Sequence, residues 1–527
     1  MIKRRRHTKK KKDLPFIEKH AEEYPQSISK NLYENRNLVL TILGNSSDII
    51  TREIDLTFPH QTKAMIIFMD ELVDKETVQH YLLDPIINHL HRDEIVDDLN
   101  EAATIYEHIM KSITSAELTE IDTINQLLDH LLTGDTILLV DGFEQGIAVG
   151  SKGGSERSVE PPTTQQVVRG PKDSFTESIS VNTALLRKRI KDPNFWLESS
   201  THGRKTKTKV VIAYIHGIVT PGIVEEVKAR LEKIDIDSIL ESGYIEELIQ
   251  DETYTPFPTI LNSERPDTIC AGLLEGRVAI LVDGTPFVLL VPALFVDFFK
   301  SSEDYYQRSD IASLIRIIRY ISFFLALLTP SVYIALTTFH QEMIPTTLLV
   351  SLAAQREGIP FPALIEALIM ELTFELLREA GVRLPSTVGS AISIVGALVI
   401  GQAAVDAGIV SATMVIVVSL TAISSFVFPN YNLAISVRML RFLFMILAAT
   451  FGLFGIFIGL LLLTLHLTSL RSFGIPYLSP FAPYISSDQL DAIILLPKWK
   501  QLFRSRLVNQ QNITRAKPRK PKPPQNR

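Results

Sequence analysis

The run FLFMILAATFGLFGIFIGLLLLTL, residues 442–465, decides the class of this chain. It holds no charged residue, and a helix of about 20 apolar residues is long enough to cross a hydrocarbon core about 30 Å thick. A buried helix of a soluble protein normally keeps a polar face over such a length. The run therefore predicts an integral membrane protein.

Three other stretches have the length and apolar character of membrane spans. They are residues 321–339, 384–405 and 408–428. Arg316 and Arg319 precede the first span, and basic residues also follow the last one, so both flanks are expected on the cytoplasmic side. Both termini would then be inside, which requires an even number of crossings, and four spans satisfy it.

Small residues recur in the decisive run. Gly452, Gly455 and Gly459 follow one another at spacings of three and four. The step from Gly455 to Gly459 is a G-x-x-x-G motif, which lets helix backbones approach closely where lipid gives no hydrophobic drive. These glycines are expected to pack against another helix, either of the same chain or of a neighbour.

Charge is distributed unevenly along the 527 residues. Residues 1–12 hold eight Lys or Arg and residues 492–527 hold ten, without an acid in either segment, although the whole chain has a net charge of −6. In a membrane protein such basic tails favour anionic lipid headgroups over nucleic acid as the partner. The start of the chain lacks the apolar core of a signal peptide, and the lone Cys270 excludes an internal disulfide.

The region before the spans contains an internal duplication, in which residues 61–150 match residues 207–292. The openings are TKAMIIFMDELV and TKVVIAYIHGIV, and the closings are TGDTILLVDGFEQGIAV and EGRVAILVDGTPFVLLV. Each closing is a strand, an Asp-Gly turn and a second strand. The carboxylates of these turns are expected to shape hairpins rather than to catalyse a reaction. The turn residues are Asp141, Gly142, Asp283 and Gly284.

These patterns predict a duplicated α/β cytoplasmic region of two lobes, followed by an α-helical multi-span membrane domain. The expected divisions are a basic disordered tail at 1–40, a first lobe at 41–150, a linker with a helix at 151–204, a second lobe at 205–300, a membrane domain at 301–470 and a cytoplasmic basic tail at 471–527.

Two fragments of the sequence resemble catalytic motifs, but neither is complete. His91-Arg92-Asp93 lacks the other parts of a kinase site, and the glycines of residues 150–155 do not follow the order of a phosphate-binding loop. The histidines show no paired metal-ligand spacing. We therefore expect neither an enzyme nor a cofactor or metal site.

Acidic residues mark the segment between the first two spans. Residues 343–381 form two helical patterns broken at GIPFP, and are predicted to form a re-entrant or in-plane hairpin that keeps the number of crossings even. Glu371, Glu375 and Glu379 share one stripe of the second helix, and Glu366 lies about 140° away from Glu371. The stripe either faces water at the interface or lines a cation pathway as stacked carboxylate rings.

Several long motifs resemble the A subunit of the GerA-type spore germinant receptors. They are RGPKDSFTESISVNTALLRKRI from Arg169, Gly170 and Pro171 onward, the two VDG closings, PFPTILNSERPD at 256–267 and GIPFPALIEALIMELTFELLREAGVRLP at 358–385. The resemblance covers about residues 40–500.

The resemblance implies a role in spore germination triggered by small nutrients, in the spore inner membrane. It also implies a transporter-like B subunit and a lipoprotein C subunit as partners, and a homo-oligomer of this subunit as the ion channel. The competing hypotheses are a secondary transporter and a scaffold subunit. The clear repeat lies in the soluble half, whereas transporters show repeats among their spans.

Overall fold

The computed structural model describes residues 27–56, 62–70, 72–87, 106, 109–115, 117–153, 161–383, 401–508 and 512–515. It divides the chain into two compact units, Met1–Ser155 with Lys191–Pro193 and Glu156–Ile190 with Asn194–Arg527. The first unit is lobe 1. The second contains lobe 2, the helical bundle and the C-terminal segment.

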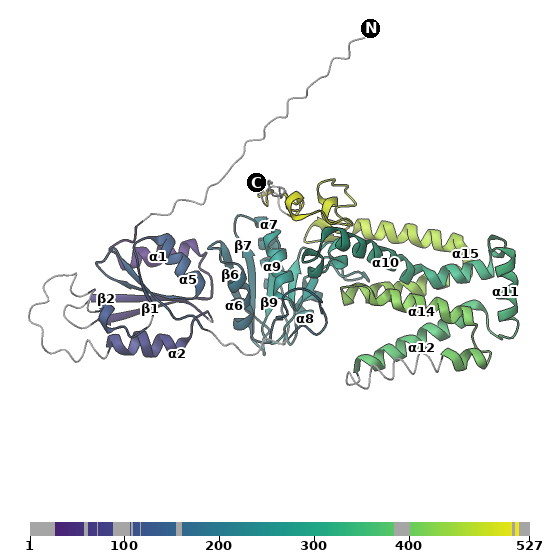
Figure 1. The fold of residues 1–527 in the computed structure, drawn as a ribbon, viewed down its shortest axis with the longest axis horizontal. Coiled ribbons are helices and arrows are strands. Elements are labelled where there is room, and N and C mark those ends of the chain that lie inside the picture. Colours follow the sequence, from purple (N-terminus) through teal and green to yellow (C-terminus); the bar gives the residue numbers. More distant parts are fainter. Residues whose placement is uncertain are drawn as a thin grey trace, which may run out of the picture. The chain divides into compact units, whose positions relative to one another are not determined.

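Lobe 1 is an antiparallel five-stranded sheet in the order β1-β2-β4-β5-β3 (Figure 1). Its elements are α1 (Leu32–Ile42), β1 (Ile49–Leu56), β2 (Thr62–Met69), α2 (Lys75–Thr77), η1 (Val78–Leu83), β3 (Leu118–Ile121), α5 (Ile124–Thr133), β4 (Thr136–Val140) and β5 (Gly146–Val149). The two central strands β4 and β5 are buried along their whole length, as their unbroken apolar runs require. Helix α1 begins inside the segment expected to be a disordered tail.

Lobe 2 repeats this sheet in the order β6-β7-β9-β10-β8. Its elements are α6 (Ile179–Arg189), β6 (Phe195–His202), β7 (Thr208–Ile215), α7 (Pro221–Glu232), α8 (Ser242–Ile249), β8 (Leu261–Ser263), α9 (Pro266–Leu274), β9 (Val278–Val282), β10 (Val288–Val291), η2 (Phe295–Phe299) and η3 (Ser302–Tyr305). Strands β2 and β7, which open the two matched sequences, hold the same second position in their sheets. This agrees with an internal duplication.

The repeat is longer than the sequence match. Helix α6 and strand β6 correspond in order to α1 and β1, so lobe 2 begins within the segment predicted as a linker up to residue 204. Strand β6 is an edge strand that pairs with β7 from Phe195 to His202. Strand β1 is likewise the edge strand of its sheet. The sequences of β1 and β6 share little, so the match between the lobes did not reveal this part of the repeat.

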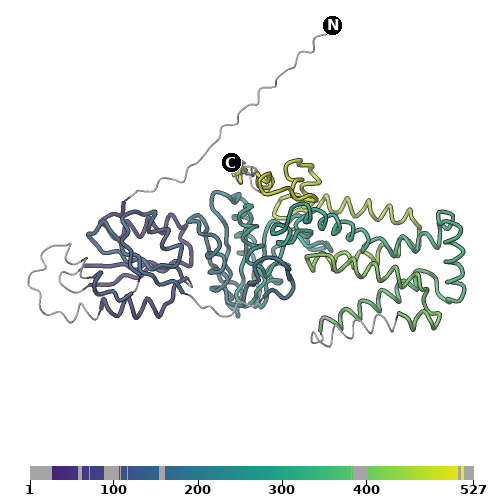
Figure 2. The backbone as a smooth tube through the Cα atoms, viewed as in Figure 1, coloured from purple at the N-terminus to yellow at the C-terminus, as the bar shows by residue number. Residues whose placement is uncertain are grey.

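A helical bundle follows lobe 2. Its elements are α10 (Ser309–Thr338), η4 (Gln341–Met343), α11 (Thr346–Arg356), α12 (Ala363–Arg383), α14 (Ala412–Phe426) and α15 (Tyr431–Ser469). In Figure 2 the backbone tube shows α10, α12, α14 and α15 running beside one another, with α11 across one end. Among the described residues, α10 and α15 are the two helices long and apolar enough to cross a membrane.

Helix α15 corrects the prediction of one uninterrupted span at 442–465. Gly452 has φ +61° and ψ −142°, which is not helical, and the chain reverses there. Beyond the reversal, a Cβ on Gly459 would lie 2.8 Å from Cε1 of Phe444, although these residues would be about 22 Å apart in a straight helix. The segment is thus a hairpin of two antiparallel helices. Only glycine adopts this backbone conformation without strain.

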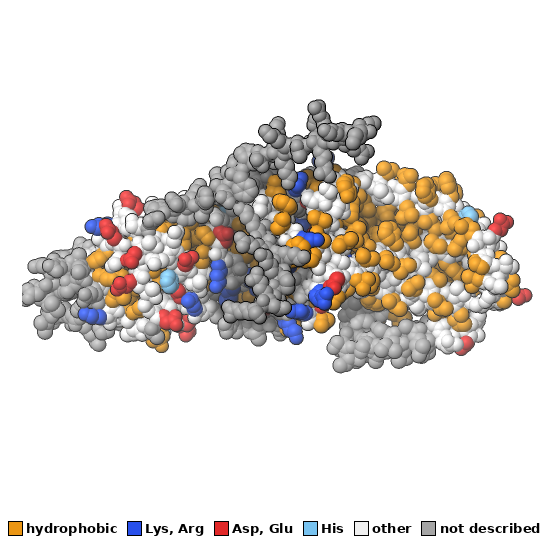
Figure 3. Space-filling model, turned by 45° about the horizontal axis from the view of Figure 1, so that its top comes forward, with side chains coloured by type: hydrophobic (Ala, Val, Ile, Leu, Met, Phe, Trp, Pro, Cys, Tyr) orange, Lys and Arg blue, Asp and Glu red, His pale blue; other side chains and the backbone are white. Residues whose placement is uncertain are grey.

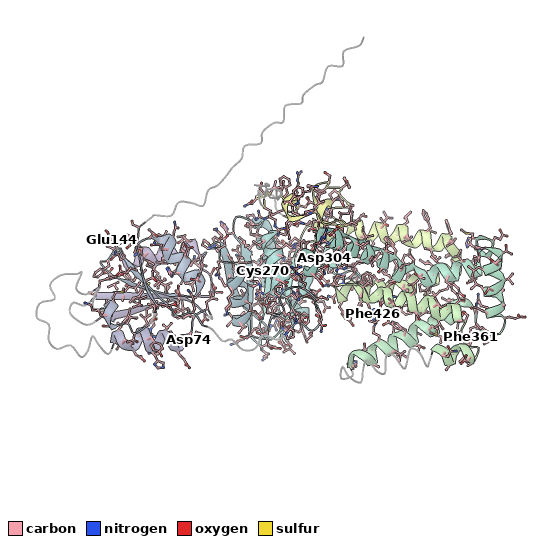
Figure 4. All side chains as sticks on the ribbon, in the orientation of Figure 1. Asp74, Glu144, Cys270, Asp304, Phe361 and Phe426 are labelled. Atoms are coloured by element: carbon pink, nitrogen blue, oxygen red, sulfur yellow. The ribbon has the colours of Figure 1, made fainter. Side chains whose placement is uncertain are left out.

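The two ends of the bundle are identified by side-chain contacts. At the lobe end, Thr255 of lobe 2 contacts His466 of the second α15 arm, and Pro256 accepts a hydrogen bond from Ser436 of the first arm. At the distal end, Gly452 packs against His340, which follows α10. Figure 4 accordingly places Phe361 and Phe426 at opposite ends.

The hairpin predicted at 343–381 forms two helices, α11 and α12. Glu366 near the start of α12 contacts Ser411 at the start of α14, and Arg378 near its end contacts Ser425 near the end of α14. Helices α12 and α14 therefore run parallel, side by side. The predicted span at 384–405 lies mostly outside the described residues.

The C-terminal segment returns to lobe 2 (Figure 1, yellow). It contains the short strands β11 (Arg471–Ser472) and β12 (Ile475–Pro476), η5 (Asp488–Asp491) and η6 (Lys498–Lys500). Phe473, Ile475 and Val508 are buried in the core of lobe 2. Residues 471–508 are therefore a folded part of this unit, whereas a basic tail was expected. We call residues 471–508 the C-terminal strap.

Candidate functional site

The two Asp-Gly turns connect the last strands of their hairpins. Gly142 has φ +89° and Gly284 has φ +91°, the left-handed conformation that glycine adopts readily. Asp141 accepts a hydrogen bond from the backbone N–H of Leu32 at 3.3 Å, at the start of α1. Asp283 accepts one from Ile179 at 3.1 Å, at the start of α6. Both carboxylates are thus engaged in joining a turn to a helix.

The linker motif at Arg169, Gly170 and Pro171 lies against the segment that leads to the bundle. Gly170 has φ +147°, and a Cβ there would lie 2.9 Å from the ring of Tyr306. The carbonyl of Pro171 accepts a hydrogen bond at 3.0 Å from Arg265. Arg169 itself is exposed. Gly170 and Pro171 therefore have packing roles, and Arg169 is open to solvent.

The motif is held by Glu264 and Arg265. Both belong to the run PFPTILNSERPD at 256–267, from which no role was predicted for them. The buried Glu264 carboxylate accepts hydrogen bonds from the backbone N–H groups of Thr164 at 2.6 Å and Gln165 at 2.9 Å. Burial disfavours its charge, but these bonds outweigh burial and lower the pKa of Glu264. Arg265, also buried, forms an ion pair at 2.8 Å with Asp267. We call Glu264, Arg265 and Asp267 the linker clamp.

A second buried charge cluster lies where lobe 2 meets α10. Asp304 accepts hydrogen bonds from Arg316 at 2.9 Å and Arg319 at 2.7 Å. Arg316 also forms an ion pair at 2.9 Å with Asp491 of the C-terminal strap. Figure 4 shows Asp304 at this boundary. These four residues, here called the junction, connect lobe 2, α10 and the strap.

The opposite charges of the junction stabilise one another. Partial burial disfavours the charge on Asp491, but Lys300 and Arg316 outweigh it and lower its pKa to about 2. Breaking a buried ion pair by removal of one partner typically costs about 3–5 kcal/mol, because the other charge is left uncompensated. In the sequence, Arg316 and Arg319 served as orientation signals only. Their partners are distant in sequence, so the pattern could not reveal the pairs.

The acids predicted to form an ion pathway are brought to one helix, α12, and each has a basic or polar neighbour. Glu371 is buried and pairs with Arg441 at 2.6 Å, and Glu375 pairs with Arg438 at 2.7 Å. Both arginines belong to the first arm of α15. Within one chain, therefore, these carboxylates are not an open acidic stripe.

The remaining two acids lie at the ends of the same helix. Glu366 is buried and accepts hydrogen bonds from the backbone N–H and the hydroxyl of Ser411 at the start of α14. Glu379 is exposed and pairs with Arg383 one turn later. Glu366 thus binds the N-terminus of a neighbouring helix, where a negative charge is favoured.

The three glycines of α15 lie at the reversal and along the contact between its two arms. A Cβ on Gly452 would lie 2.6 Å from the ring of His340, and one on Gly455 would overlap the carbonyl of Leu447 in the other arm. Their partner is therefore a helix of the same chain. Phe451, Phe454 and Phe457 point outward and are each at least 60% exposed. Figure 3 shows the apolar side chains that gather over this bundle.

Among the described residues, no group of three His, Cys, Asp or Glu side chains is placed to hold a metal ion. The charged groups with the most extensive contacts are the linker clamp, the junction and the α12–α15 pairs.

Comparison with known proteins identifies the family. Residues 37–507 match the model of the Bacillus/Clostridium GerA spore germination protein family. Spore germination protein KA of Bacillus subtilis is 49% identical over 94% of this chain and 90% of its own length. Spore germination protein GerLA of Bacillus cereus is 42% identical over 89% of this chain and 94% of its own.

A solved structure matches about half of the chain. The crystal structure of the N-terminal domain of the A subunit of the Bacillus megaterium spore germinant receptor GerK3 is 42% identical in sequence and covers 52% of this chain and 98% of that one, with a TM-score of 0.40. With the family match over most of its length, this chain belongs to the GerA family of spore germination proteins.

Proposed function

We propose that this chain is the A-type membrane subunit of a nutrient germinant receptor, and that it forms or gates an oligomeric cation channel whose opening starts germination. The observation that carries the proposal is the continuous core of the second unit. Buried apolar side chains of lobe 2, such as Leu186 and Leu273, belong to the same packed cluster as Ala326 of α10 and Phe444 of α15.

The shared core and the junction provide a route for a signal. A displacement of the C-terminal strap would act on Arg316 through Asp491, and a displacement of lobe 2 would act on Arg316 and Arg319 through Asp304. Packed interiors respond to such changes by switching between arrangements rather than by continuous deformation. Binding of nutrient elsewhere in a receptor would thus change the packing of the helices.

A membrane location follows from the same proposal. Helix α10 and the two arms of α15 would cross the bilayer, together with α12, α14 and the span predicted from the sequence at residues 384–405, so that the number of crossings is six and remains even. Both termini would be cytoplasmic, and the membrane would be the spore inner membrane. A transporter-like B subunit and a lipoprotein C subunit would complete the receptor.

The cation pathway is proposed along α12. In a ring of subunits Glu366, Glu371, Glu375 and Glu379 would recur at stacked levels, and carboxylate rings favour cations. The ion pairs of Glu371 and Glu375 with α15 would hold these acids away from the path in the resting state. Opening would then require exchange of these pairs, which links gating to the movement of α15 against α12.

Ion flux through the purified full chain tests the proposal. The chain is reconstituted in liposomes, with and without its partner subunits, and potassium efflux is followed after nutrient addition. We expect efflux that Glu371→Gln or Glu375→Gln reduces, with unchanged protein level. Saturable exchange of a solute would instead assign a secondary transporter. Absence of flux under every condition, with germination lost in the same variants, would assign a scaffold.

A further inference from the structure

The charged residues between α12 and the first arm of α15 do not balance. Glu371 and Glu375 face Arg438 and Arg441, and Arg378 approaches the same acids, with its Nη1 3.9 Å from Glu375. Three guanidinium groups thus share two carboxylates, which leaves one positive charge in excess. Residues 384–400, which lie outside the described structure, hold no charged side chain that would neutralise it.

Uncompensated charge inside a helical bundle is unfavourable, and two guanidinium groups retain free donors. Arg441 is 1% exposed and donates to Ala326 and Glu371, yet its Nη2 has no partner. The buried Nε of Arg378 also lacks one, and on the acceptor side Oε1 of Glu371 and Oε1 of Glu375 lack partners as well. The unsatisfied atoms thus include donors and acceptors, so it is the excess positive charge that calls for a further group. A ligand that carries one negative charge would compensate it.

The position of this cluster indicates where such a group would come from. Arg378 lies about one turn from the end of α12 at the lobe end of the bundle, and Arg438 lies about two turns from the start of α15. Aromatic rings flank them. The Arg378 guanidinium lies 4.6 Å from the ring centre of Phe426, and that of Arg438 lies 5.9 Å from Tyr431.

These two aromatic side chains are mostly exposed, at 69% for Phe426 and 59% for Tyr431. Exposed aromatic residues beside arginines at one end of an apolar bundle are typical of the level at which lipid headgroups lie. Guanidinium groups bind phosphate oxygens with strong, charge-assisted hydrogen bonds.

We propose that Arg378, Arg438 and Arg441 form a binding site for a phosphate oxyanion, supplied by the headgroup of an anionic phospholipid at the lobe end of the bundle. The phosphodiester carries the single negative charge that the cluster lacks. It would approach the guanidinium of Arg378 first, because this residue is nearest to the end of the bundle. The inference rests on the membrane placement of the bundle proposed above.

Lipid titration of the full chain tests the site. The chain in neutral detergent is titrated with a short-chain phosphatidylglycerol, and with a phosphatidylcholine of the same chain length, and bound lipid is counted by native mass spectrometry. We expect phosphatidylglycerol to bind more tightly. Arg378→Gln or Arg438→Gln should weaken its binding about tenfold, which corresponds to about 1.4 kcal/mol.

Arg383→Gln is the matched control. Arg383 lies on α12 about one turn beyond Arg378, is exposed and pairs with Glu379. Its loss removes the same charge from the same helix and should change the affinity by less than about twofold, since exposed pairs contribute little. Glu375→Gln should have the opposite effect to Arg378→Gln, because it releases Arg438 and increases the positive excess.

Three results would overturn the proposal. One is equal binding of the two lipids, another is equal weakening by Arg378→Gln and Arg383→Gln, and the third is weaker binding in Glu375→Gln. If inorganic phosphate binds as tightly as phosphatidylglycerol and competes with it, the oxyanion site stands and its source is free phosphate. A wrong membrane placement is recognised separately, because the chain would then stay monodisperse after removal of detergent. Circular dichroism verifies that each variant is folded.

Discussion

Lobe 1 and lobe 2 have the same strand order, and in both the Asp-Gly turn contacts the start of the first helix. In both, a buried asparagine of the first helix, Asn35 or Asn182, bonds back to the residue six positions earlier, at 2.6 Å from its Nδ2 to a backbone carbonyl. They differ at the start of one other helix. This helix is α5 in lobe 1, between β3 and β4 in the sequence, and α9 in lobe 2, between β8 and β9. Its N-cap is Thr123 in lobe 1 and Arg265 in lobe 2.

The difference shows that equivalent helix starts serve different contacts in the two lobes. Thr123 and Gln126 form a capping box that serves only α5. Arg265 leaves α9 without a side-chain cap and instead binds Asp267 and the linker. In lobe 2 this residue therefore holds the segment that precedes the lobe and does not cap its own helix. Four predictions test this comparison.

The largest effect is expected from Arg265→Ala. The substitution leaves Asp267 buried without its partner and releases Pro171, so the free energy of opening of lobe 2 should fall by about 3–5 kcal/mol. Hydrogen exchange of the full chain, followed by mass spectrometry, measures both lobes in one sample. Unchanged protection of lobe 2 would show that the clamp is dispensable. Peptides of lobe 1 provide the internal control.

Two carboxyl groups of lobe 2 should give opposite responses to pH. Burial raises the pKa of Glu246 to about 7 from its usual 4.5, so folded lobe 2 binds a proton that the unfolded chain releases. Its stability should therefore decrease as the pH rises from about 4.5 to 7, and Glu246→Gln should stabilise the lobe above pH 7 by about 1 kcal/mol.

Glu264 has the opposite sign. Its pKa is lowered in the folded lobe, so the stability that it contributes is present above the usual pKa and is lost as the pH falls through the lowered value. Exchange of lobe 2 peptides across pH, for wild type and Glu264→Gln, separates the two groups. If Glu264→Gln leaves the acid limb of the profile unchanged, the clamp carboxylate does not contribute to stability.

Thr123→Ala should have a smaller effect than Arg265→Ala, about 1 kcal/mol, because it removes only the cap of α5. The exchange of peptides from residues 124–133 measures it. An effect as large as that of Arg265→Ala would mean that the two helix starts are energetically equivalent, and the comparison between the lobes would fail.

The two Asp-Gly turns should respond equally in the two lobes. Gly142→Ala and Gly284→Ala place a Cβ in a left-handed turn where no heavy atom lies within 4 Å, so only backbone strain is added. We expect about 1–2 kcal/mol for each. A difference of more than about 1 kcal/mol between them would show that the two hairpins are not equivalent.

The sequence predicted the parts of the fold that depend on local patterns. The matching strands with their Asp-Gly turns revealed the duplicated lobes, and the apolar runs revealed the bundle. The edge strand β6 was not predicted, because its sequence FWLESSTH shares little with IITREIDL of β1. The reversal at Gly452 was not predicted, because a glycine-rich apolar run has the same composition whether it is straight or folded back.

Contacts between distant residues were not predictable from one sequence. Glu371 and Arg441 are 70 positions apart, and Arg316 and Asp491 are 175 apart. The acids of α12 were found by their spacing, but the pattern could not reveal their arginine partners. With four spans, Arg438 and Arg441 would lie on the outer side of the membrane, although basic residues normally mark the cytoplasmic side, and this conflict was the available signal of a buried role.

In the membrane placement proposed above, the reversal at Gly452 would also decide on which side of the bilayer the chain emerges. As one straight helix, the 39 residues of α15 would extend about 58 Å, far more than a bilayer core, and would deliver the strap to the opposite side. As a hairpin, the two arms would return the chain to the side from which it came. A single glycine conformation would thus bring Asp491 to the same side of the membrane as Arg316, which their ion pair requires.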